Sequence, residues 1–229
     1  MSGEGQGGPA GGGADEFTSR IQELEERGSA VLVTSDGSRA VHTDACRRLL
    51  GAAAGAPRPR LLVSTNGSVD VDSRVPPGSH LDATRVVTTG SPRSAAARAE
   101  SADDVAVEDI GDASLSDLGV AITIGVDALV EEHGPLDPAE LRVGVDSLVP
   151  LLDAHGERAV FEFLVYATGY LRTVDALGHV HLPVDREAYV ARLLAPLFDA
   201  VVEVRVRDGR PQQRWHLDDG AVSSRWLPV

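Results

Sequence analysis

Short apolar runs alternate with amphipathic segments along most of this sequence, and this alternation restricts the possible folds more than any other feature. The runs with the length and continuous apolar character of buried strands are 30–34, 60–65, 84–88, 141–145 and 178–182. Helical patterns precede or separate them, at 15–27, from Thr43 or Asp44 to about 54, 114–130, 157–176 and 186–197. This order predicts an α/β fold of three layers, with a mostly parallel sheet flanked by helices.

The two ends of the chain depart from the alternation. Residues 1–14 are rich in glycine and lack periodicity, which predicts a disordered tail ahead of a single domain over 15–229. Near the other end, strand-like segments at 200–206 and 213–217 flank Asp208-Gly209, the pattern of a C-terminal β-hairpin. Residues 66–82 are expected to form a surface loop, and 105–110 a short edge strand.

The helix over 114–130 is the least certain element in the pattern itself. Ser114 and Asp117 have the spacing of a capping box, which favours a helix that starts here. The β-branched run Ile122-Thr123-Ile124 also fits a strand. Both interpretations stay open at this point.

The charged residues exclude several kinds of chemistry. The 21 basic residues are all arginines, and they face 35 acidic residues, which gives a net charge of −14. Without lysine, the chain can form no Schiff base, no lysine general base and no lysine-bearing phosphate loop. The acidic excess predicts a halophilic protein of haloarchaeal type, with an acidic bacterial protein as the alternative. It also argues against nucleic acid as a partner, because phosphate binding needs clustered cations.

Cysteine content and hydropathy set further bounds. Cys46 is the single cysteine, so the chain has no intrachain disulfide, and its place in a predicted helix suggests a small packing residue. No apolar run approaches the length of a membrane span, and the N-terminus lacks the pattern of a secretory signal. We therefore expect no membrane contact and a cytoplasmic location.

The strand Val143-Gly144-Val145-Asp146, followed by Ser147-Leu148, carries a likeness to a known group. It resembles the Walker B strand of the core ATPase domain of RecA, RadA and KaiC, in which the aspartate orients magnesium. The later order is similar too: a long helix, the strand 178–182, and the closing strand and hairpin from 198 onwards. The resemblance covers roughly residues 30–217 and implies a RecA-like P-loop fold. The chain looks like a member of an uncharacterised haloarchaeal family of degenerate RecA-type proteins.

The phosphate loop departs from that family. A P-loop has a glycine, four residues, then Gly-Lys-Ser/Thr between a strand and a helix. The best fit here starts at Asp36 and puts Val41 at the second glycine, His42 at the lysine and Thr43 at the hydroxyl. A neutral histidine supplies no fixed charge, and Asp36 repels a triphosphate. The motif is therefore a degenerate Walker A, and hydrolysis of ATP through it is not expected.

Any surviving nucleotide site would use the positions that correspond to the family's motifs, which are Asp36, Gly37, His42, Thr43, Asp146 and Ser147. One carboxylate with one hydroxyl makes a poor magnesium site without substrate phosphates. The alternative is that Asp146 caps the next helix or holds the strand end. We accordingly assign no catalytic residue, no metal and no cofactor, with ATP and magnesium as the alternative.

Two other groups of residues carry weaker signals. His179 and His181 lie two apart on a strand and therefore face the same side, but a zinc site needs a third ligand, for which Asp185 or His155 are candidates. Tyr166 and Tyr170 lie one helical turn apart and could belong to a partner surface or cover a neighbouring loop.

These observations favour a non-catalytic RecA/KaiC-like domain that acts as a regulatory or protein-interaction module, through a protein partner or self-association. The alternative is a nucleotide-binding sensor that binds ATP without hydrolysing it, which would need Arg39, Thr43 and Asp146 to converge on the nucleotide. A small enzyme with a relocated site is a third hypothesis that no residue pattern supports.

Overall fold

The fold is taken from a computed structural model, which describes residues 12–35, 39–51, 58–66, 71–90 and 105–229. The strands are β1 (Ser29–Ser35), β2 (Arg60–Ser64), β3 (Thr84–Thr88), β4 (Ala106–Asp109), β5 (Arg142–Val145), β6 (Leu177–Leu182), β7 (Ala200–Arg207), β8 (Arg210–Leu217), β9 (Val222–Ser223) and β10 (Leu227–Pro228). The α-helices are α1 (Gly12–Glu25), α2 (Arg39–Leu49), α3 (Val71–Arg74), α4 (Leu115–His133), α5 (Val149–Thr173) and α6 (Tyr189–Leu194).

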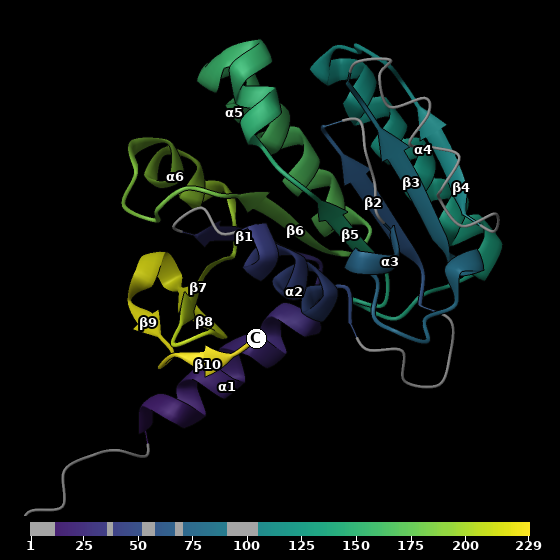
Figure 1. The fold of residues 1–229 in the computed structure, drawn as a ribbon. Helices are drawn as coiled ribbons and strands as arrows, with labels where there is room; N and C mark the ends of the chain where they lie inside the picture. Colours follow the sequence, from purple (N-terminus) through teal and green to yellow (C-terminus); the bar gives the residue numbers. More distant parts are fainter. Residues whose placement is uncertain (1–11, 36–38, 52–57, 67–70, 91–104) are drawn as a thin grey trace, which may run out of the picture.

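The strands form one sheet in the order β10-β8-β7-β1-β6-β5-β2-β3-β4, with β9 beside β8 (Figure 1). The seven from β7 to β4 in this order run parallel, and β8, β9 and β10 are antiparallel to their neighbours. The predicted α/β fold with a mostly parallel sheet and a C-terminal β-hairpin is confirmed. The hairpin extends the parallel sheet on the β7 side.

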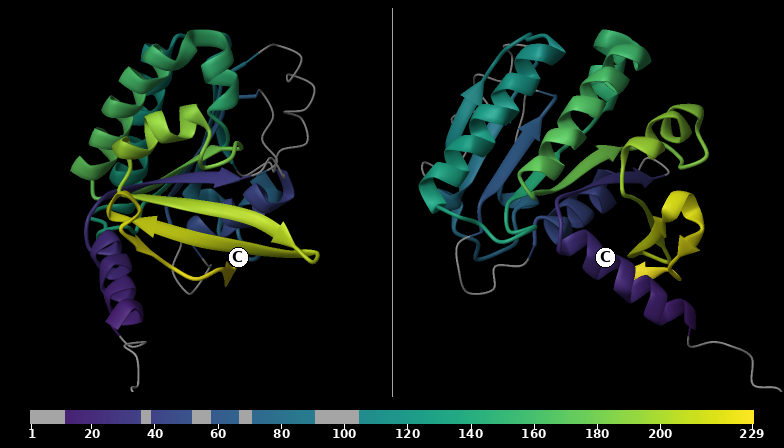
Figure 2. Two further views of the ribbon diagram at one scale, coloured as in Figure 1. Left: turned by 90° about the vertical axis from the view of Figure 1, so that its left-hand side faces the viewer. Right: turned by 180° about the vertical axis from the view of Figure 1, so that it is seen from behind.

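Helices cover both faces of the sheet, which gives the three predicted layers. On β1, Ala30 and Leu32 pack with α4, α5 and α6, whereas Val31 and Val33 pack with α1 and α2. Figure 1 shows α2 and α3 in front of the sheet, and the view from behind in Figure 2 shows α4 and α5 on the other side. The central strand is apolar throughout because both of its faces are buried.

The elements agree with the sequence pattern best where the pattern is strongest. Strand β3 has the predicted bounds, and β4 is the predicted short edge strand. The capping box is present: the Ser114 hydroxyl accepts from the backbone N–H of Asp117, whose carboxylate accepts from the N–H of Ser114. Ile122 through Ile124 therefore belong to α4, and the alternative of a strand there is wrong.

Several boundaries differ from the prediction. Helix α2 begins at Arg39, so Thr43 and Asp44 lie within it and do not cap it. Helix α5 begins at Val149, ahead of the predicted start at Glu157, and Gly156, with a non-helical φ of 77°, forms a kink between its two parts. The predicted loop over 66–82 contains α3 and overlaps the 3₁₀ turn Leu81–Ala83. At the N-terminus, α1 starts at Gly12, and residues 1–11 of the predicted tail lie outside the described residues.

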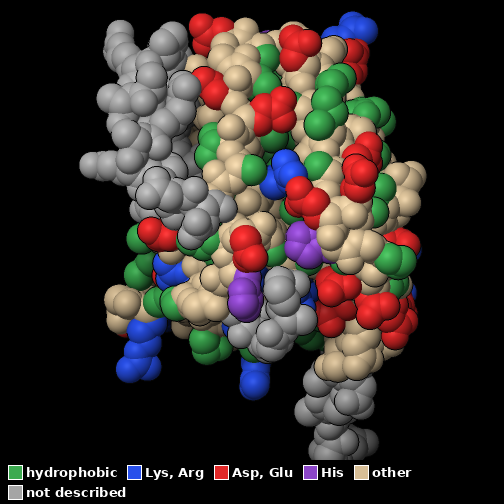
Figure 3. All heavy atoms as spheres, turned by 90° about the vertical axis from the view of Figure 1, so that its right-hand side faces the viewer, with side chains coloured by type: hydrophobic (Ala, Val, Ile, Leu, Met, Phe, Trp, Pro, Cys, Tyr) green, Lys and Arg blue, Asp and Glu red, His purple; other side chains and the backbone are tan. Residues whose placement is uncertain are grey.

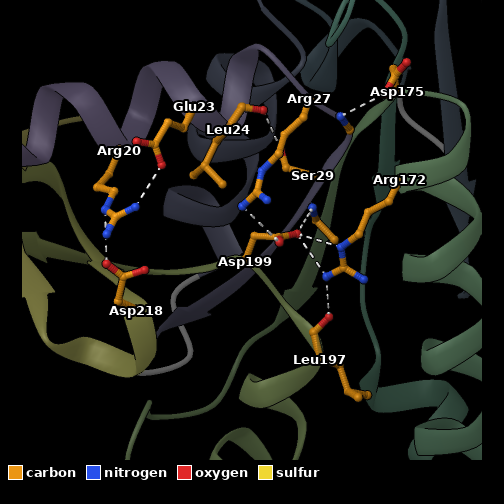
Figure 4. Close-up of polar contacts among 12 residues, drawn as sticks. Arg20, Glu23, Leu24, Arg27, Ser29, Arg172, Asp175, Leu197, Asp199 and Asp218 are labelled. Carbon is orange, nitrogen blue, oxygen red and sulfur yellow. Dashed lines mark hydrogen bonds and ion pairs between the residues drawn. The ribbon is translucent and has the colours of Figure 1, made fainter.

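A polar cluster holds the start of β1 against the end of α5 (Figure 4). The Asp199 carboxylate accepts a hydrogen bond from the backbone N–H of Ala30 at 2.9 Å and is held by Arg172 of α5 at 2.9 Å. Arg172 also donates to the carbonyl of Leu197. Three segments that are distant in the sequence thus meet at one carboxylate.

Among the helices that the structure describes, none combines the length and the apolar character needed to cross a membrane.

Candidate functional site

The carboxyl ends of the central parallel strands are where ligands bind in open α/β sheets. Four neighbouring strands, β1, β6, β5 and β2, end at the same edge, close to the first turn of α2 and to α3 (Figure 1). Polar side chains gather at this edge: Ser35 ends β1, Ser64 ends β2, Asp146 follows β5 and His181 lies near the end of β6. The fold therefore brings the predicted residues Asp146 and His42 to one edge of the sheet.

Asp146 is fully engaged by its neighbours. One carboxylate oxygen accepts from the backbone N–H of Thr65 at 2.9 Å and from its hydroxyl at 3.1 Å. The other accepts from the hydroxyl of Ser64 at 3.0 Å and faces a guanidinium nitrogen of Arg74 at 3.4 Å. Its side chain is 5% exposed. Asp146 thus fastens β5 to β2 and α3, which supports the interpretation that it holds the strand end.

Asp146 does not cap helix α5. The residue at the N-cap is Leu148, which offers no side-chain hydrogen bond. Ser147 takes part of that role, since its hydroxyl accepts from the backbone N–H of Val149 at 3.2 Å. The alternative of a capping Asp146 is therefore wrong.

His42 points into the protein. It lies in the first turns of α2 and is 8% exposed. Its Nε2 is 2.6 Å from the hydroxyl of Ser35, and its Nδ1 is 2.7 Å from Nδ1 of His181. Thr43 follows it in α2 and is half-buried. Asp36 and Gly37, the other predicted loop positions, lie outside the described residues.

His42, Cys46, His179 and His181 form a buried group that we call the α2–β6 cluster. Nε2 of His179 lies 3.4 Å from the sulfur of Cys46. The rings of His179 and His181 meet edge to face, with their centroids 5.1 Å apart. Gly144 of β5 makes room for it, because a Cβ there would come within 2.8 Å of the His179 ring. The predicted shared face of His179 and His181 is therefore the face that α2 covers.

Burial keeps three of these four residues uncharged. It lowers the pKa of His179 to about 3 and that of His181 well below its ordinary value, in both cases mainly through loss of hydration. Burial also raises the pKa of the Cys46 thiol to about 11. At neutral pH His179, His181 and Cys46 thus offer neutral imidazoles and a thiol, and they supply no fixed positive charge to an anion.

The spacing of the two histidines of β6 predicts their shared face but not their partner. The predicted third ligands are Asp185 and His155, whereas the residue beside His179 is Cys46. His155 is exposed on α5. The signal that could have identified the cluster is the spacing of His42 and Cys46, four apart on one helix that must cover the sheet face of β6.

The two tyrosines of α5 contact the neighbouring helix. The rings of Tyr166 and Tyr170 stack with their centroids 6.4 Å apart. The hydroxyl of Tyr166 lies 3.0 Å from the hydroxyl of Thr123, and the hydroxyl of Tyr170 donates to the carboxylate of Asp127 at 2.8 Å. They therefore join α5 to α4, while half of Tyr166 remains exposed.

Comparison with known proteins places the chain in a family. Residues 28–204 match the model of a family described as "Family of unknown function (DUF7504)". The chain belongs to this family. No curated protein matches it.

Solved structures show what fold this DUF7504 chain has. It is similar to the KaiC-like protein PH0186 from the hyperthermophilic archaeon Pyrococcus horikoshii OT3, with a TM-score of 0.52 and 14% sequence identity. The likeness covers 88% of this chain and 85% of that protein. At this identity it shows the fold alone, which is RecA-like and KaiC-like.

A RecA-like fold implies a nucleotide with magnesium, and the described residues do not fit that group. The chain has no lysine to hold the phosphates. His42 is turned inward, and the Asp146 carboxylate already faces Arg74 and accepts bonds from Ser64 and Thr65. A magnesium ion here would have to compete with a guanidinium for the same oxygen.

Proposed function

We propose that this protein is a non-catalytic RecA-like module that acts through protein–protein contacts in a high-salt environment. The observation that carries the proposal is the inward orientation of His42, which is bonded to Ser35 and His181. The residue that replaces the P-loop lysine thus supports the fold. Asp146 likewise holds strands together, so the two positions that would serve nucleotide chemistry serve packing.

Calorimetry tests the absence of nucleotide chemistry. We expect titration of the full chain with ATP or ADP, in multimolar KCl and with Mg²⁺, to give no heat beyond dilution and no phosphate release. The matched variant is Asp146→Asn, which keeps an oxygen acceptor for Thr65. Saturable micromolar binding that this variant loses would replace the proposal with the nucleotide-sensor alternative.

A groove between α4 and α5 supports a role in protein binding. It encloses about 530 Å³ and is lined by Leu115, Gly119, Val120, Phe163 and Tyr166, among others. Val120 is 57% exposed and Tyr166 53%, and Ile124, one turn after Val120, is 54% exposed. Large apolar side chains that are exposed together on two packed helices mark an interaction surface.

The charge of the chain indicates which partner fits this groove. Glu162 contributes to the groove, and Asp127 lies beside Tyr170. Figure 3, which views the molecule from the side of β4 and α4, shows acidic side chains spread among hydrophobic ones. Salt screens charges in direct contact less than distant ones, so the carboxylates beside the groove favour a basic partner over a second acidic copy. We therefore propose a different protein as partner, with an apolar segment flanked by arginine or lysine.

A random peptide library displayed on phage provides a probe for this surface. Selection should enrich peptides with apolar residues flanked by basic ones, and Val120→Asp should abolish their binding. The control is Val206→Asp on β7, because Val206 has a similar exposure (45%) and does not line the groove. Absence of enrichment, or equal binding by Val120→Asp, would contradict the proposal. A dimer in light scattering that Val120→Asp abolishes would instead identify a second copy as the occupant.

A further inference from the structure

The α2–β6 cluster contains nitrogen atoms that make no hydrogen bond and a sulfur beside them. The sulfur of Cys46 and a ring nitrogen from each of His179 and His181 lie within 4.8 Å of one another, and all three residues are buried. Nδ1 of His179 and Nε2 of His181 have no hydrogen-bond partner. An unsatisfied buried polar atom destabilises a fold, so the unpaired Nε2 of His181 in particular requires a partner.

We propose that Cys46, His179 and His181 bind a divalent ion of the zinc class. One thiolate and two neutral imidazoles are ligands that Zn²⁺ prefers, whereas Mg²⁺ and Ca²⁺ prefer oxygen. None of these three residues is among the positions predicted for a nucleotide site. The site lies beneath the first turns of α2, on the face of β5 and β6 where Gly144 leaves room for the His179 ring.

The observed distances are close to those of a metal site. Zinc bonds of about 2.3 Å to sulfur and about 2.0–2.1 Å to nitrogen put tetrahedral sulfur and nitrogen ligands about 3.5 Å apart. The sulfur of Cys46 and Nε2 of His179 are 3.4 Å apart. The widest separation in the group is within 4.8 Å, so closure around an ion needs a movement of only about 1 Å.

His42 and Ser35 would orient His181 as a ligand. If Nε2 of His181 binds the ion, its Nδ1–H donates to Nδ1 of His42 at 2.7 Å, and Nε2–H of His42 donates to the Ser35 hydroxyl at 2.6 Å. This assignment gives each donor one acceptor. Ligating histidines commonly donate their second ring N–H in this way, which fixes the tautomer that coordinates the metal.

Binding of a cation here would turn Cys46 into the anionic ligand of the site. Cys46 is a thiol while no metal is bound, so binding forms a metal–thiolate bond and releases the thiol proton to solvent. Arg74 opposes a cation, and Asp146, which faces Arg74 at 3.4 Å, offsets that effect. The bound ion would join α2 to β6 and hold His42 inward. Three protein ligands leave a fourth position for water or another small ligand.

Cobalt provides a spectroscopic test that assigns the ligands directly. We would remove metal from the tag-free full chain with a chelator, titrate it with Co²⁺ without oxygen, and record the absorption spectrum. The expected result is a sulfur-to-cobalt charge-transfer band with intense visible bands of tetrahedral cobalt, saturating at one ion per chain and lost on addition of Zn²⁺. Because the chain has a single cysteine, the charge-transfer band identifies Cys46 without any variant.

Variants then test the assignment of the ligands. Cys46→Ala should abolish the charge-transfer band and His179→Ala should weaken both sets of bands, whereas the matched control His155→Ala, at an exposed histidine of α5, should leave the spectrum unchanged. Zinc should also raise the denaturation midpoint of the wild-type chain and not that of Cys46→Ala. A wild-type chain that shows no saturable charge-transfer band, or that binds cobalt with visible bands alone, overturns the proposal.

Discussion

Replacing Asp199 by alanine should destabilise the protein strongly, because this carboxylate joins three segments that are distant in the sequence (Figure 4). It accepts the backbone N–H of Ala30 at the start of β1 and two donors of Arg172, Nε at 3.1 Å and a terminal nitrogen at 2.9 Å. Arg27 adds a contact at 3.9 Å from a side chain that is 64% exposed. Asp199 itself is 15% exposed, so water cannot readily replace it.

The magnitude follows from the partners that the substitution leaves behind. The buried N–H of Ala30 would lose its acceptor, which costs about 1–3 kcal/mol. Arg172 is 37% exposed, so solvent screens its pair with Asp199 and we assign it about 1 kcal/mol. Arg27 contributes little because it is mostly exposed. The free energy of unfolding should therefore fall by about 3 kcal/mol in Asp199→Ala.

Urea denaturation at fixed KCl measures this loss. With a slope of about 2–3 kcal/mol per M, the midpoint should fall by about 1–1.5 M. Asp199→Asn should fall less, because its amide oxygen can still accept from Ala30. The matched control is Glu131→Ala, at an exposed carboxylate of α4, which should leave the midpoint unchanged. An Asp199→Ala midpoint equal to that of Glu131→Ala would refute the reasoning.

Four other predictions concern packing, pH, capping and salt. Gly178→Ala should lower the melting temperature, because the new Cβ would lie 2.3 Å from a methyl of Leu171. Gly169→Ala in α5 has open space around it and should stabilise the protein by up to about 1 kcal/mol. A lower melting temperature for Gly169→Ala would contradict this. Because burial lowers the pKa of His179 from 6.5 to about 3, the unfolded chain binds a proton that the folded chain does not, and stability should fall as pH drops from 6.5 towards 3. Denaturation at pH 7 and pH 5 should show a smaller fall in His179→Asn than in the wild-type chain. Ser114→Ala should destabilise by about 1 kcal/mol in thermal unfolding, since it removes the cap of α4. A net charge of −14 should make the melting temperature rise with KCl, and equal values at low and multimolar KCl would remove the halophilic interpretation.

The sequence was sufficient to predict most of the strands. Buried strands of a parallel sheet are apolar on both faces, so runs such as 84–88 stand out without any knowledge of their neighbours. Helix boundaries were harder, because they depend on local geometry. Helix α2 starts at Arg39 among polar residues that carry little periodicity, and Gly156 with its positive φ hid the first turns of α5.

The candidate site was predictable only in part. Asp146 could be placed at the end of a strand, but its partners Ser64, Thr65 and Arg74 come from other elements and depend on the strand order. Cys46 was interpreted as a packing residue because a lone cysteine in a helix carries no signal of its neighbours. Its position beside His179 depends on which face of β6 the helix covers, and that face is set by the packing of the whole sheet.

The two outer strands of the sheet carry features that disfavour pairing with a strand of another chain. In the described part of the chain β4 pairs only with β3, and its four exposed residues end in Glu108 and Asp109. A second chain that docked there in register would place carboxylates against carboxylates. At the opposite border, β10 is two residues long and includes Pro228, which has no N–H to donate. Growth of a fibre by strand addition is therefore disfavoured at both borders.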